Sequence, residues 1–151
     1  MTKLILKEYN LGSLGENLED EYNHFLDKCE NSTVFHTIEW SQIITISTGR
    51  ENRIILAFDM EKIVGSFSYF TSKTSFIHKA LVSSLDETPY GGPLSLKGYE
   101  YGIDLIMNKI LHSNHNLFYI TTAPGSSLGI LKKHGFKMEK MANAFLSLKG
   151  N

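Results

Sequence analysis

The sequence predicts a single α/β (α+β) domain with a mixed, mostly antiparallel central sheet of about six or seven strands flanked by helices. The patterns follow the order strand, two helices, three strands, helix, strand, helix and strand. The middle strands succeed one another directly, so they pair antiparallel, whereas helices separate the later strands. The length of 151 residues suits one domain, which we expect to span residues 1–151.

The N-terminal third predicts one strand and two helices. Residues 3–9 form the strand, and the acidic segment 16–21 suits the positive end of a helix dipole. Apolar residues then recur at helical spacing: Leu18, Tyr22, Phe25, Leu26 and Cys29. A second helix takes Thr37 as its N-cap and ends at Gly49. The side chains that we expect to face inward from this helix are Trp40, Ile43, Ile44 and Ser47.

The middle third predicts antiparallel strands. Residues 53–60 and 62–70 alternate and are rich in β-branched and aromatic side chains, which indicates a hairpin. Residues 75–85 predict a third antiparallel strand. Gly65 inside the second strand indicates a bulge or a close backbone approach. Residues 86–98 carry turn chemistry throughout.

The last third predicts helices and strands in alternation. A helix covers 99–112, and a continuous apolar strand at 116–123 is expected in the centre of the sheet. A short helix then directs Leu128 and Leu131 inward and ends at Gly135. A last strand runs from Phe136 to Leu148.

Composition excludes several classes of protein. A net charge of -1 argues against a dedicated nucleic-acid binder, which carries a basic excess. No apolar stretch is long enough to span a bilayer. Cys29 is the only cysteine, so an intramolecular disulfide cannot form, and a reducing, cytoplasmic setting fits best. We expect a buried apolar thiol rather than a nucleophile.

Two short motifs carry the most information. Segment 34–40 reads Val-Phe-His-Thr-Ile-Glu-Trp, and segment 88–94 reads Thr-Pro-Tyr-Gly-Gly-Pro-Leu. The order of elements, the hairpin turn at 58–65 and the helix end at 132–136 (Lys-Lys-His-Gly-Phe) resemble the GNAT-fold acyltransferase superfamily. The two motifs are most similar to the N-terminal domain of FemAB-type proteins, which form peptidoglycan bridges by aminoacyl transfer.

This resemblance implies an N-acyltransferase-type domain that binds an amine-bearing peptide or a cell-wall-precursor-like acceptor. FemAB-type proteins contain two tandem GNAT-like domains and transfer amino acids from aminoacyl-tRNA. The chain resembles the first of these domains. The expected partners are therefore a small-molecule or peptide acceptor, and a second GNAT-like domain or a homodimer. A tRNA would bind only where a partner domain supplies the site.

The resemblance also implies positions that acetyl-CoA-dependent members use, and the chain departs from them. Their phosphate loop reads Gln/Arg-x-x-Gly-x-Gly/Ala, whereas the interval 85–99 spaces its glycines differently and Pro93 lacks an N–H. Leu131 stands where a tyrosine would protonate the departing thiolate, and Pro124 stands where an asparagine is common. We therefore expect no cofactor, with acetyl-CoA disfavoured, and the catalytic residues stay unknown.

The candidate substrate-binding residues come from both motifs. Tyr90, Gly91 and Gly92 form a loop in which two glycines allow a ligand to approach the backbone, although a tight turn accounts for them equally well. His36 and Trp40 lie one helical turn apart, where His36 could contact a substrate. The alternative that we favour is structural.

In that alternative, the rings of Phe35 and Trp40 staple the start of the helix while His36 satisfies a backbone carbonyl. Glu39 is a conceivable base, but a partner for the helix dipole is the preferred interpretation. The histidines show no metal-ligand spacing, so no metal is expected.

Three functions stay open. The first is the FemAB-like acyltransferase domain, the second is an acetyl-CoA-dependent N-acetyltransferase with an unusual phosphate loop, and the third is a non-catalytic binding module. Fold resemblance does not separate them.

Overall fold

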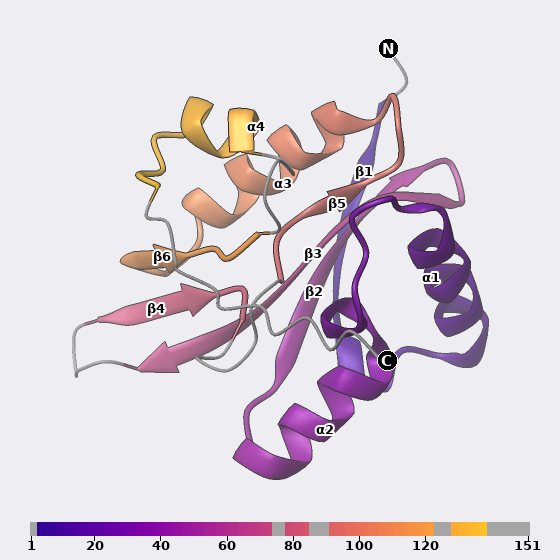
Figure 1. Cartoon of the computed structure of the whole chain (residues 1–151), viewed down its shortest axis with the longest axis horizontal. Coiled ribbons are helices and arrows are strands. Elements are labelled where there is room, and N and C mark those ends of the chain that lie inside the picture. Colours follow the sequence, from indigo (N-terminus) through magenta and orange to yellow (C-terminus); the bar gives the residue numbers. More distant parts are fainter. Residues whose placement is uncertain (1–2, 74–77, 85–90, 123–127, 139–151) are drawn as a thin grey trace, which may run out of the picture.

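The computed structural model describes residues 3–73, 78–84, 91–122 and 128–138. Their core is a six-stranded mixed sheet, shown in Figure 1. Its main path runs β1 (Ile5–Asn10), β2 (Asn52–Asp59), β3 (Lys62–Lys73), β4 (Lys79–Val82) and β6 (Leu117–Tyr119), and β5 (Leu94–Ser95) also pairs with β3. Neighbouring strands are antiparallel except β4 and β6, which are parallel. The predicted fold class is confirmed.

Helices cover both faces of this sheet. They are α1 (Glu16–Lys28), α2 (Ile38–Thr48), α3 (Glu100–Leu111) and α4 (Leu128–Lys133), with short 3-10 turns η1 (Leu11–Ser13) and η2 (Val34–His36). α1 and α3 lie on opposite sides of the strands (Figure 1). Both faces of β2 and β3 are therefore buried, and residues 63–70 are all buried. The periodic residues Tyr22, Phe25, Leu26 and Cys29 join this core as expected.

The bounds of α2 follow from its end residues. The Thr37 side chain accepts a hydrogen bond from the Trp40 N–H at 3.2 Å, and Gly49 ends the helix with φ 68°. Both predictions are confirmed. The predicted inward face is only partly right. Trp40 and Ile44 are half-buried, but Ile43 is 54% exposed and Ser47 is exposed, and the buried residues of this helix are Ile38 and Ser41.

A bulge interrupts the β2–β3 hairpin, as Gly65 indicated. Ala57 pairs with Gly65, but Phe58 pairs with Ile63, so β3 has one extra residue at this point. A Cβ on Gly65 would lie 3.4 Å from the Ala57 Cβ and 3.5 Å from the Leu94 carbonyl oxygen. These are ordinary contact distances, so Gly65 marks the bulge, and the pairing of β5 with β3 does not depend on its missing side chain. The sequence showed only turn chemistry in this stretch and did not predict β5.

The C-terminal elements are shorter than predicted where the structure describes them. β6 has three residues, and it lies at the end of the sheet path formed by the described strands rather than in its centre. Gly135 follows α4 with φ 85°, as expected of a residue that ends a helix. Residues 136–138 are not in a strand, and the rest of the predicted last strand lies outside the described residues. None of the described helices has the length and apolarity needed to cross a bilayer.

Candidate functional site

The first motif folds into a capped turn at the end of the α1–α2 connection. The Thr33 side chain accepts a hydrogen bond from the Phe35 N–H at 3.3 Å, and the Thr33 N–H donates to the His36 Nδ1 at 3.1 Å. The rings of Phe35 and Trp40 meet edge to face, with centroids 5.1 Å apart. The structural interpretation of this motif thus agrees with the geometry.

His36 joins the two motifs. Its Nε2 lies 3.1 Å from the Gly92 carbonyl oxygen, and its own carbonyl accepts a 2.8 Å hydrogen bond from the Tyr22 hydroxyl. Because Nδ1 accepts from Thr33, Nε2 carries the proton and donates to Gly92, so the ring is neutral. Burial lowers the pKa of His36 below its ordinary value. Both ring nitrogens are used inside the protein, and a direct contact with substrate stays a prediction.

The glycines of the second motif pack against the carboxyl ends of the two parallel strands. A Cβ on Gly91 would lie 2.5 Å from the Ser83 carbonyl oxygen, and one on Gly92 would lie 2.5 Å from the Thr122 Cγ2. The Gly91 N–H also donates to the Thr121 carbonyl at 3.2 Å. Close contact within the protein therefore accounts for both glycines, neither of which has a positive φ. Tyr90 lies outside the described residues.

Hydroxyl groups fill the same strand ends. The Ser83 hydroxyl accepts from the Thr121 N–H at 2.9 Å, and the Ser84 and Thr121 hydroxyls are hydrogen-bonded to each other. Ligands of open α/β sheets bind outside the carboxyl ends of parallel strands. In this chain Gly91, Gly92 and these hydroxyls occupy that region, next to the buried His36. The sequence located both motifs without indicating that they meet here.

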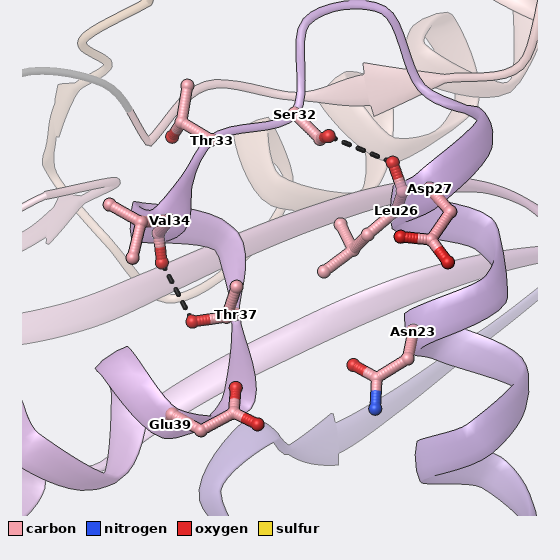
Figure 2. A pocket seen from close by; sticks show the side chains of 8 residues that line it. All are labelled: Asn23, Leu26, Asp27, Ser32, Thr33, Val34, Thr37 and Glu39. Carbon is pink, nitrogen blue, oxygen red and sulfur yellow. Dashed lines mark hydrogen bonds between the residues drawn. The ribbon is translucent and has the colours of Figure 1, made fainter.

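A pocket of about 460 Å³ lies between α1 and the start of α2, and residues of the first motif line part of it (Figure 2). It is lined by Asn23, Leu26, Asp27, Ser32, Thr33, Val34, Thr37 and Glu39. None of these eight side chains is basic, and two are carboxylates. Sequence analysis missed Asn23 and Asp27, although both lie on the polar side of the predicted first helix.

The walls of this pocket are fixed by local hydrogen bonds. The Ser32 hydroxyl donates to the Leu26 carbonyl at 2.8 Å, and the Thr37 hydroxyl donates to the Val34 carbonyl at 2.8 Å (Figure 2). The carboxylates of Asp27 and Glu39 come from different helices and are exposed. Their negative charge and the surrounding hydroxyl and amide groups favour a ligand that carries an ammonium group. Trp40 is half-buried and does not line this pocket.

The start of α3 decides whether a diphosphate would fit. In other proteins the free N–H groups of a helix N-terminus bind phosphate. Here the Glu100 carboxylate accepts the Gly98 N–H at 3.0 Å, and its own N–H and that of Gly98 lower the pKa of Glu100. The Tyr99 N–H donates to the Leu96 carbonyl at 3.0 Å. The exposed Glu100 carboxylate therefore satisfies the Gly98 N–H at the start of α3 and adds a negative charge there.

One other polar cluster has a structural role. Asp104 on α3 accepts hydrogen bonds from Lys133 at 3.1 Å and His134 at 2.9 Å. Burial opposes ionisation of Asp104, but these two partners outweigh it and lower its pKa. The contacts join α4 to α3. Within the described residues, no three histidine, cysteine or acidic side chains are grouped to hold a metal ion.

Comparisons with known proteins connect this geometry to a fold. A scan against protein-family models found no match, and no curated protein matched. Among solved structures, an acetyltransferase from Trypanosoma brucei is 16% identical with a TM-score of 0.57, covering 96% of this chain and 100% of that chain. A ribosomal-protein-alanine N-acetyltransferase from Brucella melitensis biovar Abortus 2308 is 9% identical with a TM-score of 0.54, covering 97% and 100%.

An aminoglycoside N-acetyltransferase in complex with CoA is also similar. It is 8% identical with a TM-score of 0.54, and the match covers 97% of this chain and 95% of that chain. At these identities the likeness concerns the fold, and it extends over almost the whole length of each chain. The chain therefore has the fold of the GNAT acetyltransferases.

Proposed function

We propose that this chain is an N-acyltransferase-type domain of the FemAB kind, which binds an amine-bearing peptide or a cell-wall-precursor-like acceptor. The observation that carries the proposal is the pocket between α1 and α2, which presents Asp27 and Glu39 without a basic neighbour among its lining residues. A protonated amine gains charge-assisted hydrogen bonds there. The GNAT fold and the FemAB-like motifs 34–40 and 88–94 support the same reaction class.

The chemistry asked of the domain is acyl transfer to nitrogen. The ammonium group held by the pocket first gives up one proton to solvent, and the neutral amine then attacks the acyl carbonyl carbon to form a C–N bond. The bond to the leaving group breaks, and the nitrogen loses a second proton, which the leaving group takes up. Asp27 would hold the acceptor by its charge, and the fixed walls at Ser32 and Thr37 would set its orientation. Such positioning can supply a large part of the rate. No side chain is assigned as the general base.

The donor is better explained as an aminoacyl ester than as acyl-CoA. Glu100 already occupies the N–H groups at the start of α3, and a diphosphate would have to displace a carboxylate of the same sign. This carboxylate disfavours CoA bound with its diphosphate at the start of α3. An aminoacyl-tRNA would need a partner domain, because a net charge of -1 gives this chain no basic excess to attract the phosphate backbone.

The candidate substrate contacts belong to this proposal. Gly91 and Gly92 would border the donor side of the site, where the parallel strands end. Tyr90, which lies outside the described residues, stays a proposed substrate contact. His36 and Trp40 would shape the acceptor side by holding the turn that carries Thr33 and Thr37. If Trp40 contributes to acceptor binding, its substitution should weaken the affinity of the chain for the acceptor.

Acceptor binding is tested with a lysine-containing peptide of the cell-wall-precursor type. We expect saturable binding by calorimetry, and we expect at least about tenfold weaker binding to Asp27→Asn, as loss of one charge-assisted contact predicts. The matched peptide acetylated on its lysine amine is the control ligand. Equal affinity of the wild type for both peptides would contradict recognition of the amine.

An acetyl-CoA-dependent N-acetyltransferase is the second candidate, because the similar structures are acetyltransferases and one contains CoA. Titration with acetyl-CoA, with desulfo-CoA as a second ligand, decides between the two. Saturable binding would favour this candidate. A binding module without catalysis is the third, supported by the close packing at Gly91 and Gly92, and it predicts peptide binding without turnover of either donor.

A further inference from the structure

A second pocket, of about 190 Å³, lies at the carboxyl end of α3. Its lining comes from β1, β2, β3 and β4, from the last turn of α3 and from the residues that follow this helix. Because α1 and α3 lie on opposite sides of the sheet, this pocket is separate from the one between α1 and α2 (Figure 1). At about 30 Å³ for each water-sized atom it holds about six such atoms, so it suits a small metabolite rather than a drug-sized ligand.

One wall presents a carboxylate that is fixed in place and has one oxygen to spare. The Glu8 Oε1 accepts hydrogen bonds from the Tyr69 hydroxyl at 2.6 Å and from the Arg53 Nε at 3.1 Å. Burial, and then this contact with Glu8, raises the pKa of Tyr69, so the phenol keeps its proton and remains a donor. None of the described residues donates to the Glu8 Oε2, which therefore stays available to a ligand.

Another wall presents an ammonium group. Lys109 stands in the last turn of α3 and lines the same pocket. Among the described residues no carboxylate lies within ion-pair distance of it, so Lys109 and Glu8 share the pocket without pairing. Arg53 is outside the lining and its side chain is 41% exposed, so water screens part of its charge. The pocket thus offers one free anionic acceptor and one free cationic donor.

The remaining part of the lining that matters for a ligand is apolar. It consists of three buried aliphatic side chains, which are Ile55, Leu81 and Ile110. Small-molecule sites in proteins combine such an apolar surface with a few polar groups that fix the orientation of the ligand. An aliphatic group therefore suits this part of the pocket.

An aliphatic α-amino acid carries the complementary groups. Its ammonium group pairs with Glu8, its carboxylate pairs with Lys109, and its side chain covers the aliphatic surface. A simple amine would leave Lys109 without a partner. A simple carboxylate would place a second negative charge beside Glu8. A ligand that has both charges satisfies both walls.

We propose that the pocket at the carboxyl end of α3 binds a free aliphatic α-amino acid, with Glu8 holding its ammonium group and Lys109 its carboxylate. The contacts are charge-assisted hydrogen bonds, which are stronger than those between neutral groups. The site lies apart from the pocket between α1 and α2, so the inference stands without the proposed acyl transfer.

Calorimetric titration of the full chain with L-valine tests the proposal from the side of the ligand. We expect saturable binding with a dissociation constant between about 10 μM and about 1 mM. L-Valinamide keeps the ammonium group but lacks the carboxylate, and 3-methylbutanoate keeps the carboxylate but lacks the ammonium group. Each should bind at least about tenfold more weakly than L-valine, because each loses one charge-assisted contact.

Two variants assign each charge to its partner. Lys109→Met removes the ammonium group and keeps the apolar stem, and Glu8→Gln removes the charge but keeps an oxygen that accepts from Tyr69. Each should weaken L-valine binding at least about tenfold. Lys109→Met should leave the affinity for L-valinamide within about twofold, and Glu8→Gln should not weaken binding of 3-methylbutanoate.

Lys28→Met is the matched control. Lys28 stands in the last turn of α1, so it has the same relation to a helix dipole as Lys109, but it lines neither pocket. This variant should bind L-valine within about twofold of the wild type. Far-UV circular dichroism confirms that each variant folds.

Three outcomes would overturn the proposal. One is a wild type that shows no saturable binding of L-valine up to about 10 mM. Another is a wild type that binds L-valinamide or 3-methylbutanoate as tightly as L-valine. The third is binding of L-valine that Asp27→Asn weakens and Glu8→Gln does not, which would place the amino acid in the pocket between α1 and α2.

Discussion

Replacement of Gly91 by alanine tests whether the second motif is closed by the protein itself. The new Cβ would lie 2.5 Å from the Ser83 carbonyl oxygen, which is about 0.9 Å closer than the 3.4 Å at which ordinary contact begins. The obstacle is backbone, so rotation of a side chain cannot relieve it. Either the segment moves and weakens the Gly91 N–H bond to Thr121, or Ser83 moves together with β4.

The cost follows from these two effects. Overpacking of a tight site costs about 1–3 kcal/mol, and a weakened buried hydrogen bond adds about 1 kcal/mol. We therefore expect Gly91→Ala to lower the free energy of unfolding by about 2–4 kcal/mol. Urea unfolding followed by circular dichroism measures this change. The slope of the free energy of unfolding against urea concentration shows whether the folded or the unfolded state has become more or less compact.

Gly129→Ala is the matched control. Gly129 lies in α4, and an added Cβ there would meet nothing within 4 Å. The same substitution should stabilise the protein by about 0.5–1 kcal/mol through helix propensity and a less flexible unfolded chain. If Gly91→Ala unfolds at the same urea concentration as the wild type, the segment has room for a side chain, and the close packing described above is wrong.

Three further predictions concern buried polar groups. Burial lowers the pKa of His36 in the folded state, so between that lowered value and the ordinary value of 6.5 the unfolded state binds more protons. The stabilisation due to neutral His36 is present above pH 6.5 and is lost as pH falls through the lowered pKa of the folded state. The pKa of His115 is also lowered, and His115 therefore affects stability in the same direction. The measurement is thus the difference in free energy of unfolding, from urea titrations, between wild type and His36→Gln. This difference should shrink from pH 7.5 toward about pH 5, and a constant difference would contradict a neutral His36 ring. Ser41→Ala removes a hydroxyl that is buried without a partner and should raise the free energy of unfolding by about 1 kcal/mol, and a loss of stability would indicate a bound water or other partner at this position. Burial raises the pKa of Cys29 to about 11, so at pH 8 a disulfide reagent should label it at the rate of unfolding rather than at that of a free thiol; rapid labelling of the folded protein would show that the thiol is accessible.

The sequence predicted those parts of the fold that local chemistry determines. Thr37 and Gly49 mark the ends of α2 because capping depends on neighbouring residues, and Gly65 indicated the bulge because a glycine inside a strand often marks a bulge or a close backbone approach. β5 was missed because two residues pair with β3 only through contacts distant in sequence. The orientation of α2 was mispredicted because its apolar and polar residues are spread around the helix, so that no side of it is clearly apolar.

The candidate site shows the same division. The motif around His36 and the motif around Gly92 were both recognised, but the hydrogen bond between them joins residues 56 positions apart. No local pattern specifies that contact. The pocket was missed for a similar reason, since Asp27 and Glu39 come from different helices and become neighbours only when the α1–α2 connection folds back.

The parallel pairing of β4 and β6 has a consequence for the order in which the chain folds. β2 and β3 are joined by a tight turn, whereas each residue of β4 pairs with a residue of β6 that lies 37 positions later in the chain, with α3 between the two strands. Pairings with large sequence separation close long loops and tend to form late. Interactions that are absent from the folding transition state affect the unfolding rate. Gly91→Ala should therefore accelerate unfolding and leave the refolding rate nearly unchanged, so the two arms of its chevron plot report when this end of the sheet is assembled.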